Sequence, residues 1–297
     1  MKILNFGSLN YDYVYSVNHI VNPGETISSS KMETFCGGKG LNQSIALARA
    51  GTKVYHAGIV GKDGETLINI CQENGVDTSN ICESEGKSGH TIIQVDENGQ
   101  NCILLFGGSN ISMTKKFIDN VLSSFEDGDI VILQNEINLL DYIIEESYKK
   151  GIKIILNPSP FNSALKLCDL SKVSIFILNE IEGEQLTGEK ETSKILNEML
   201  LKYPNAQIIL TLGSAGAIYK DRKQEYFQNI YKVDVVDTTG AGDTFTGYFI
   251  SSLINKIPIN ESLEIAARAS AISVSREGAT ASIPFLKEVK EAKLYYK

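Results

Sequence analysis

The stretch DTTGAGDTFTG, residues 237–247, gathers small and turn-forming residues around one acid, Asp243, and then becomes apolar. The segment before it, KVDVVD at 232–237, reads as a strand, and residues 244–253 have a helical pattern. The glycine turn at 240–242 is therefore expected at the amino end of a helix. Small residues there let backbone N–H groups approach an oxyanion, and aligned peptide dipoles add about half a positive charge. The stretch predicts an anion site between a strand and a helix.

Asp243 falls in the first turn of this expected helix, beside any bound anion. A carboxylate next to a phosphate is repelled, unless its task is to accept a proton from an attacking hydroxyl and so lose its charge. The alternative is that Asp243 only caps the helix, because Asp is a favoured capping residue. The spacing alone leaves both interpretations open.

Composition narrows the classes of protein to consider. A chain of 297 residues that is 42% hydrophobic can bury a large core, and its net charge of −8 provides no basic field for nucleic acid or an anionic membrane. Its five cysteines are scattered without a CxxC pair, which favours reduced thiols over a disulfide frame or a zinc site. No signal peptide and no run of about 18 apolar residues is found. We therefore expect a cytoplasmic protein that binds anions locally.

Strand and helix patterns alternate along the chain, which predicts one α/β domain over residues 1–297. Several strands are apolar on consecutive positions, as in a parallel sheet covered by helices on both faces. Ligands bind beyond the carboxyl ends of such strands. The expected strands are KILNFGSL, KVYHAGIVG, DIVILQNE, KIILNPSP, VSIFILNE and QIILTLG, and the expected helices are residues 41–50, ETLINICQEN and LLDYIIEESYKKG.

Two segments break this alternation. Residues 11–35 and 88–108 are rich in Tyr, Thr, Val, Ile and turn residues and have no helical period. Both are expected to be β insertions that form a small sheet projecting from the core.

The common nucleotide motifs are missing. The chain has no GxxxxGK[ST] loop, no GxGxxG after the first strand and no protein-kinase signature. These absences argue against a Walker-type nucleotide loop and a dinucleotide-binding half.

A second polar constellation lies near the amino terminus, in FCGGKGLNQ at residues 35–43. Its glycines, Gly37 and Gly38, allow backbone to approach a ligand at the start of a helix. Carboxamides, carboxylates and ammonium groups recognise polyol hydroxyls, because each hydroxyl both donates and accepts. Each such group taken singly also reads as a solvated loop residue. The candidates for hydroxyl recognition are Asn10, Asp12, Lys39, Asn42 and Glu136.

Six motifs together resemble, in order and spacing, the ribokinase or PfkB family of carbohydrate kinases: GSLNYD, GGKGLNQ, NPSP, LNEIEGEQLTG, TLGSAGA and VDTTGAGDTFTG. The resemblance covers essentially the whole chain. It implies a doubly wound, mostly parallel sheet sandwiched by helices, with a small β lid formed by segments 11–35 and 88–108. It also implies ATP-dependent phosphorylation of a sugar hydroxyl, with Asp243 as general base and the N–H groups of Gly240, Ala241 and Gly242 as the anion hole.

The resemblance assigns further roles by motif. The implied cofactors are ATP, Mg²⁺ and K⁺. The implied ATP and magnesium residues are Asn179, Glu182, Thr211, Gly213, Gly216, Gly240 and Gly242, and the implied substrate residues are Asn10, Asp12, Gly38, Lys39, Asn42, Glu136 and Asp243. The implied potassium ligands are Asp237, Thr239, Ser273, Arg276, Gly278 and Ser282.

The substrate is predicted less directly than the reaction. The set of polar residues favours ribose, converted to ribose 5-phosphate, with fructose or another free sugar and then a nucleoside as alternatives. Few Arg or Lys residues lie in the motif loops, which disfavours a phosphorylated sugar. GLNQS replaces the family's usual GANQA, and Tyr11 is bulky where a small residue is usual. By analogy with the family, we expect a homodimer that pairs its lids.

Two hypotheses from other classes remain. One is a sugar-binding regulator without catalysis, against which the intact Asp243 argues. The other is a kinase for a hydroxymethylpyrimidine, against which GGKGLNQ argues.

Overall fold

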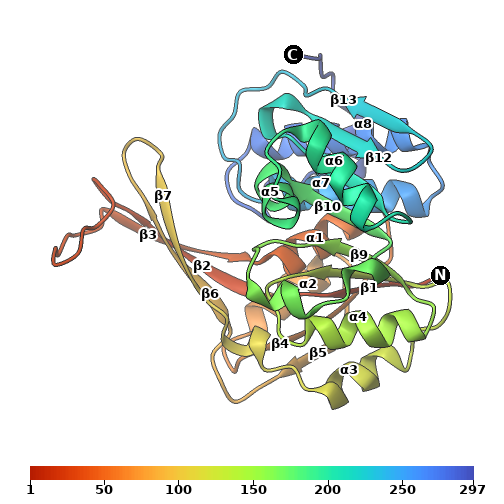
Figure 1. Cartoon of the computed structure of the whole chain (residues 1–297). Helices are drawn as coiled ribbons and strands as arrows, with labels where there is room; N and C mark the ends of the chain where they lie inside the picture. Colours follow the sequence, from red (N-terminus) through yellow and green to blue (C-terminus); the bar gives the residue numbers. More distant parts are fainter.

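The computed structural model describes all 297 residues and contains two sheets (Figure 1). The larger sheet has nine strands in the order β13-β12-β11-β10-β9-β8-β1-β4-β5. All neighbouring pairs from β11 to β5 are parallel, whereas β12 and β13 are antiparallel additions at one edge. Its strands are β1 (Ile3–Phe6), β4 (Tyr55–Val60), β5 (Asp77–Glu83), β8 (Ile130–Gln134), β9 (Lys153–Asn157), β10 (Ile175–Asn179), β11 (Gln207–Thr211), β12 (Ala217–Lys220) and β13 (Glu225–Gln228).

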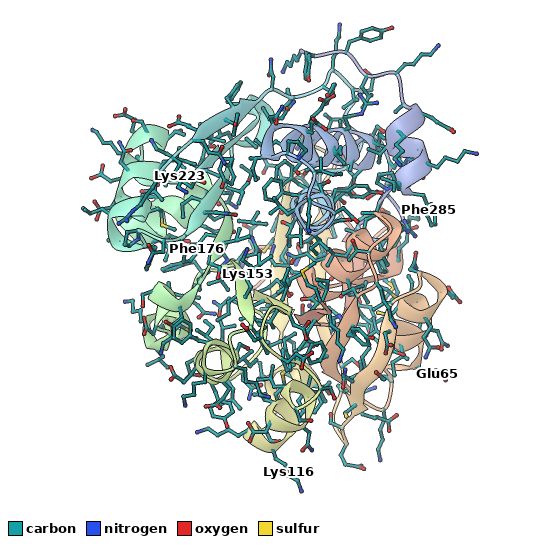
Figure 2. The ribbon with its side chains drawn as sticks, turned by 90° about the vertical axis from the view of Figure 1, so that its right-hand side faces the viewer. Glu65, Lys116, Lys153, Phe176, Lys223 and Phe285 are labelled. Atoms are coloured by element: carbon teal, nitrogen blue, oxygen red, sulfur yellow. The ribbon has the colours of Figure 1, made fainter.

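Helices cover both faces of this sheet, as its continuous apolar strands predict (Figure 2). Successive strand residues alternate between two cores of nearly equal size, with 31 and 29 buried residues, so neither face is left to solvent. One face packs on α1 (Lys39–Arg49), α2 (Glu65–Glu73), α7 (Ala241–Ile254), α8 (Ile259–Val274) and α9 (Leu286–Glu291). The other packs on α3 (Lys115–Leu122), α4 (Leu140–Lys149), α5 (Glu180–Thr187) and α6 (Thr192–Lys202). The predicted doubly wound architecture is confirmed.

The second sheet projects from the body of the molecule (Figure 1). Its strands are β2 (Asn10–Ser16), β3 (Lys31–Gly37), β6 (Gly89–Val95) and β7 (Asn101–Phe106), in the order β3-β2-β6-β7. The pairing of β2 with β6 is parallel, and the two outer pairings are antiparallel. These strands arise from the two segments expected to be β insertions.

One expected strand is wrong. Residues 232–237, KVDVVD, form no strand, and the exposed fractions of Val235 and Val236 are 64% and 56%. No neighbouring strand pairs with them. Instead, the N–H groups of Val236 and Asp237 both donate to the carbonyl of Val274 at the end of α8. Alternating valines are typical of a strand, but here they belong to an extended loop along a cavity. Strands β12 and β13, which lie between the predicted strands QIILTLG and KVDVVD, were not expected.

Two close approaches hold α1 in place. A Cβ built on Gly40, at the start of α1, would lie 2.5 Å from the Gly7 Cα beyond β1. A Cβ built on Gly247, in α7, would lie 2.9 Å from the Leu47 backbone nitrogen and closer still to the Ala46 side chain. Both positions therefore require glycine. Helices α1 and α7 pack backbone to backbone at this point.

None of the helices is long and apolar enough to cross a lipid bilayer. All five cysteines are unpaired.

We expect Gly247→Ala to destabilise the fold. Alanine favours a helix over glycine by about 1 kcal/mol, but overpacking a tight contact costs about 1–3 kcal/mol, and the obstructing atoms here include backbone. The free energy of unfolding from urea denaturation should therefore fall. Ser252→Ala, which adds no atom to the same helix, is the control. Unchanged or increased stability of Gly247→Ala would show that the helices can separate without cost.

Candidate active site

The turn before α7 has the geometry of an anion site. Gly240 is the N-cap of α7 with φ 71°, a left-handed conformation that favours glycine. No side chain caps the helix, so its first N–H groups face the cavity. The Ala241 N–H makes one long bond of 3.3 Å to the Thr238 carbonyl. The backbone here offers donors and partial positive charge to an oxyanion.

Asp243 is 7% exposed and does not cap its own helix. Its Oδ2 accepts a hydrogen bond from Asn42 Nδ2 at 3.0 Å, and its Oδ1 accepts one from Gln43 Nε2 at 2.9 Å. Both donors belong to α1. The capping interpretation is therefore wrong, because α1 rather than α7 satisfies the carboxylate.

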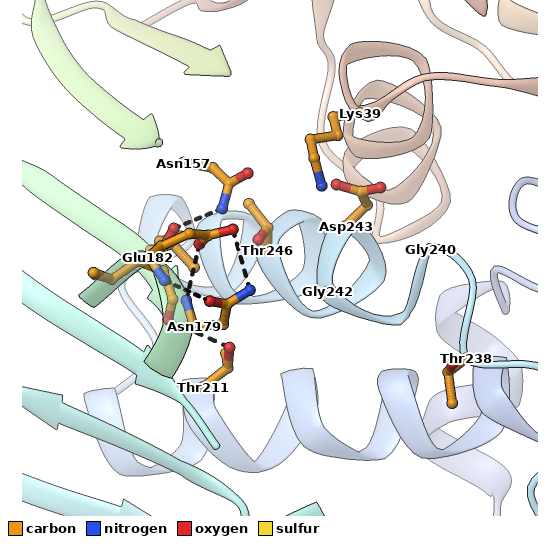
Figure 3. A pocket seen from close by; sticks show the side chains of 12 residues that line it. Lys39, Asn157, Asn179, Glu182, Thr211, Thr238, Gly240, Gly242, Asp243 and Thr246 are labelled. Atoms are coloured by element: carbon orange, nitrogen blue, oxygen red, sulfur yellow. Dashed lines mark hydrogen bonds between the residues drawn. The ribbon is translucent and has the colours of Figure 1, made fainter. Parts of the chain in front are cut away.

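The carboxylate of Asp243 acts on the charge of Lys39, whose ammonium group points toward Asp243 in Figure 3. Burial opposes its charge, but the carboxylates of Asp243, Glu136 and Glu182 outweigh burial and raise the pKa of Lys39. Glu136 Oε2 accepts hydrogen bonds from the Lys39 N–H at 3.0 Å and from the Ser8 hydroxyl. Burial nevertheless raises the pKa of Glu136. Acidic groups outnumber the single cation here.

Asn10 and Asp12 lie at the base of the projecting sheet, on β2. Asn10 Oδ1 accepts from Asn110 Nδ2 at 2.6 Å, and Asp12 Oδ1 accepts from the Thr91 hydroxyl at 2.5 Å. Burial raises the pKa of Asp12, and the charge of Asp243 adds to the increase. Gly38, with φ 94°, leaves room for Asn10 beside it.

Asn42 has one unused group. Its Nδ2 is bonded to Asp243, but its buried Oδ1 has no hydrogen-bond partner. A buried acceptor without a donor costs about 1–3 kcal/mol, so a ligand hydroxyl that donates to it would be bound favourably.

A polar cavity of about 240 Å³ opens beside Asp243. In Figure 3, Glu182 and Asn157 lie at one end of it, while Lys39 and Asp243 lie at the other. It is lined by Lys39, Asn157, Ile177, Leu178, Asn179, Glu182, Thr211, Thr238, Gly240, Gly242, Asp243 and Thr246.

A larger, mostly apolar cavity of about 610 Å³ shares Asn179, Thr211, Thr238 and Gly242 with the polar one. The two cavities are therefore contiguous. Its walls include Gly213 and Gly216, and the apolar residues Tyr231, Val233, Val235, Phe245, Ala267, Ala271 and Val274. A flat aromatic base suits such walls, with a phosphate chain leading into the polar cavity.

Asn179 and Glu182 form a capping box at the start of α5. Asn179 Oδ1 accepts from the Glu182 N–H at 2.9 Å, and Glu182 Oε2 accepts from the Asn179 N–H at 3.0 Å. Both side chains also line the polar cavity, so capping and ligand binding use the same pair. No group of three or more His, Cys, Asp or Glu side chains is arranged to hold a metal ion by itself.

The residues implied as potassium ligands are only partly brought together. Asp237 joins two loops: its Oδ1 accepts from the Thr239 N–H at 2.9 Å, and its Oδ2 accepts from the Gly278 N–H at 3.0 Å. Ser273 and Ser282 bond to each other through buried hydroxyls at 2.8 Å. The guanidinium of Arg276 forms an ion pair with Glu288 at 2.6 Å, so only its carbonyl remains for a cation.

Sequence reasoning missed several polar residues around the site. Gln43 and Asn157 lie within motifs quoted above, GGKGLNQ and NPSP, but were not singled out. Asn157 lines the polar cavity, and its buried Oδ1 has no partner. Thr91 and Asn110, which hold Asp12 and Asn10, come from the projecting-sheet segment and the turn after it. Thr91 is 79 residues from Asp12 in sequence, so no local pattern identifies Thr91 as its partner.

Comparisons with known proteins agree with this geometry. The sequence profile of the pfkB family carbohydrate kinases matches residues 1–286. A ribokinase from Staphylococcus aureus is 35% identical, over 98% of this chain and 99% of its own. The ribokinase of Cryptococcus neoformans, solved with ADP, is 32% identical with a TM-score of 0.87 over 98% of this chain and 99% of its own. The Arabidopsis thaliana ribokinase, solved with ribose and ATP, is 28% identical with a TM-score of 0.86 over 98% and 97%.

We expect Asp12→Asn to stabilise the folded chain near neutral pH. Folding disfavours the Asp12 carboxylate, so this cost is absent below the ordinary pKa of 3.8 and fully present above the raised value. Asparagine keeps an oxygen for the Thr91 hydroxyl but has no charge. The gain should be about 0.5–2 kcal/mol at neutral pH and should shrink as the pH approaches about 4.

Chemical denaturation across this pH range checks the expectation. Asp234→Asn, which neutralises an exposed carboxylate, should leave stability nearly unchanged throughout. A loss of stability in Asp12→Asn at neutral pH would mean that the carboxylate is favoured in the fold.

Proposed function

Because the chain belongs to the pfkB family of carbohydrate kinases, we propose that it transfers the γ-phosphate of ATP to the primary hydroxyl of ribose, giving ribose 5-phosphate. One observation carries the proposal. The buried carboxylate of Asp243 lies in the wall of a polar cavity. It lies between the side-chain amides of Asn42 and Gln43 on α1 and the backbone N–H groups that begin α7. A proton acceptor and an anion hole are therefore adjacent.

The sugar is proposed to bind where α1 meets the projecting sheet. The unpartnered Oδ1 of Asn42 accepts a sugar hydroxyl, and the carboxylates of Asp12 and Glu136 accept others. The positive charge of Lys39 acts on Glu136, whereas the charge that acts on Asp12 is the negative one of Asp243. A phosphorylated sugar would add negative charge among carboxylates whose pKa values are already raised, so a free sugar fits better.

ATP is proposed to lie across the two cavities. The apolar one, about 610 Å³, accommodates the base and ribose, and the polar one accommodates the phosphates. The amino end of α7 lies where the cavities meet, because Gly242 lines both. The Arabidopsis ribokinase described with ribose and ATP supports a ternary complex of this kind.

The transfer itself follows from these positions. The C5 hydroxyl of ribose attacks the γ-phosphorus while Asp243 accepts its proton. A new O–P bond forms as the bond to the β–γ bridging oxygen breaks, and ADP leaves with that electron pair. The N–H groups of Gly240, Ala241 and Gly242 stabilise the charge on the transferred group, and Lys39 offsets the surrounding acids.

Two cations are part of the proposal. Three residues offer oxygen ligands in the polar cavity: Glu182, Asn179 and Asn157, whose Oδ1 is unpartnered. Oxygen ligands suit Mg²⁺ that is held partly by water and phosphate. Bound there, Mg²⁺ neutralises phosphate charge. The loops joined by Asp237 offer oxygen ligands for K⁺ beside the anion hole.

ADP release with a panel of substrates tests the proposed function. The purified chain with ATP and Mg²⁺ should respond most strongly to ribose among ribose, deoxyribose, fructose, ribose 5-phosphate, nucleosides and a hydroxymethylpyrimidine, with and without K⁺. Asp243→Asn should lower kcat with ribose by about 10²–10⁴-fold, because it cannot accept the proton.

Asp234→Asn is the matched control, since its carboxylate is exposed and lies outside both cavities. Ribose-dependent turnover that survives in Asp243→Asn would refute the assignment of the base. A wild-type chain that responds to the pyrimidine or to no sugar would refute the substrate class.

A homodimer through the projecting sheet is a further part of the proposal. Every residue of β7 is exposed, including Ile103 at 56%, Leu104 at 66% and Phe106 at 52%. Strands β3 and β7 are also unpaired edges. An apolar edge strand exposed on both faces is an aggregation hazard, which pairing with the lid of a second copy would remove.

We expect the chain to sediment at about twice its mass of 32.6 kDa at micromolar concentration. The double substitution Ile103→Lys/Leu104→Lys places charge on both faces of β7 and should yield a monomer. Leu201→Lys changes an exposed leucine on α6 and should not alter the mass. A monomeric wild type would disprove the dimer.

A further inference from the structure

A hydrogen-bonded network of buried polar side chains runs from Asp243 into the core, away from both cavities. It passes from α1 to β8, then to β1, back to α1 and finally to β4. Each member beyond Asp243 is 0% exposed. Its links are Gln43 Nε2 to Asp243 Oδ1 at 2.9 Å, Gln134 Nε2 to Gln43 Oε1 at 2.7 Å, Gln134 Nε2 to Asn5 Oδ1 at 2.9 Å, Asn5 Nδ2 to Ser44 Oγ at 2.8 Å, and Ser44 Oγ to His56 Nδ1 at 2.8 Å.

His56, at the far end of this network, fixes the direction of the hydrogen bonds within it. Burial lowers the pKa of His56 to about 4, so the ring is neutral at physiological pH. Its Nε2 lies 3.2 Å from the Gly7 carbonyl, which can only accept, so Nε2 carries the proton. Nδ1 must therefore accept from the Ser44 hydroxyl. That hydroxyl in turn accepts from Asn5 Nδ2, which leaves Asn5 Oδ1 as an acceptor for Gln134.

Gln134 transmits this direction to the active site. Its amino group uses both hydrogens, one for Asn5 Oδ1 and the other for Gln43 Oε1. Gln43 is thereby held with its carbonyl toward Gln134 and its amino group toward Asp243. The opposite orientation of the Gln43 amide would place its oxygen against the Asp243 carboxylate and repel it.

We propose that Gln43 and Gln134 are positioning residues for Asp243, which orient the carboxylate toward the sugar hydroxyl by presenting a fixed amide donor to its Oδ1. This inference rests on the proposed function of Asp243 as the base. Gln134 lines neither cavity, so it acts only through Gln43. Within this network only the Oε1 of Gln134 lacks a hydrogen-bond partner, and the remaining bonds together specify one arrangement of the amides.

The test is Gln134→Met, which keeps the side-chain length and removes both donors. Without the Gln134 amino group that donates to its Oε1, Gln43 can turn its amide, and the Asp243 carboxylate loses its fixed position. We expect kcat with ribose to fall by about 10–100-fold, while KM for ribose and for ATP stays within about twofold of wild type. Combining it with Gln43→Met should add less than about a further twofold loss, since the two residues act as one unit.

Thr52→Val is the matched control. Thr52 bonds to Ser251 at 2.7 Å through buried hydroxyls, so its loss also weakens contact between the end of α1 and α7, but far from Asp243. Its kcat should remain within about twofold of wild type. If Gln134→Met does not fold, Gln43→Met with the same control gives the same readout.

The inference is overturned if folded Gln134→Met keeps the wild-type kcat, if only KM rises, or if the two substitutions lower kcat independently. A crystal structure of Gln134→Met distinguishes failure of the positioning role from failure of the proposed function. It should show the Asp243 carboxylate displaced or in more than one orientation. An unmoved carboxylate refutes the positioning role, whatever substrate the wild-type chain uses.

Discussion

The contact between α1 and α7 is the constraint on which the site depends. The two helices are about 200 residues apart in sequence, and they touch backbone to backbone because Gly247 has no side chain to separate them. That approach places the amides of Asn42 and Gln43 against Asp243. The same helices bring their amino ends to the edge where the parallel strands finish. Packing in the core therefore sets the distance between the proposed base, the proposed anion hole and the proposed sugar site.

Charge is distributed unevenly between the two halves of the site. On the proposed sugar side, Asp12 and Glu136 have raised pKa values, and one ammonium group, Lys39, lies among the acids. On the phosphate side, the attraction comes from backbone dipoles at the start of α7 rather than from a cluster of basic side chains. This division suits a neutral polyol on one side and a polyanion on the other. It also explains how a chain of net charge −8 can bind ATP.

Much of this could be predicted from sequence, for reasons visible in particular elements. Strand β8, IVILQ, is apolar up to Gln134 because helices cover both of its faces, and the glycine turn before α7 indicated a helix start. The KVDVVD segment was wrongly predicted to be a strand, because valines on a cavity wall alternate as they do in a strand. The Gln134 partner of Gln43, and the Asn5 partner of Gln134, could not be predicted, because both are single polar residues in strands that otherwise read as apolar core. Contacts across 90 or more residues have no local signature.

The most direct test of the account is a crystal structure of the chain with ribose and a non-hydrolysable ATP analogue. It should place the primary hydroxyl of ribose about 2.6–3.2 Å from an Asp243 oxygen, with the γ-phosphate on the N–H groups that begin α7. A ribose whose hydroxyl lies beyond hydrogen-bond reach of Asp243, or a γ-phosphate bound away from that turn, would contradict the account.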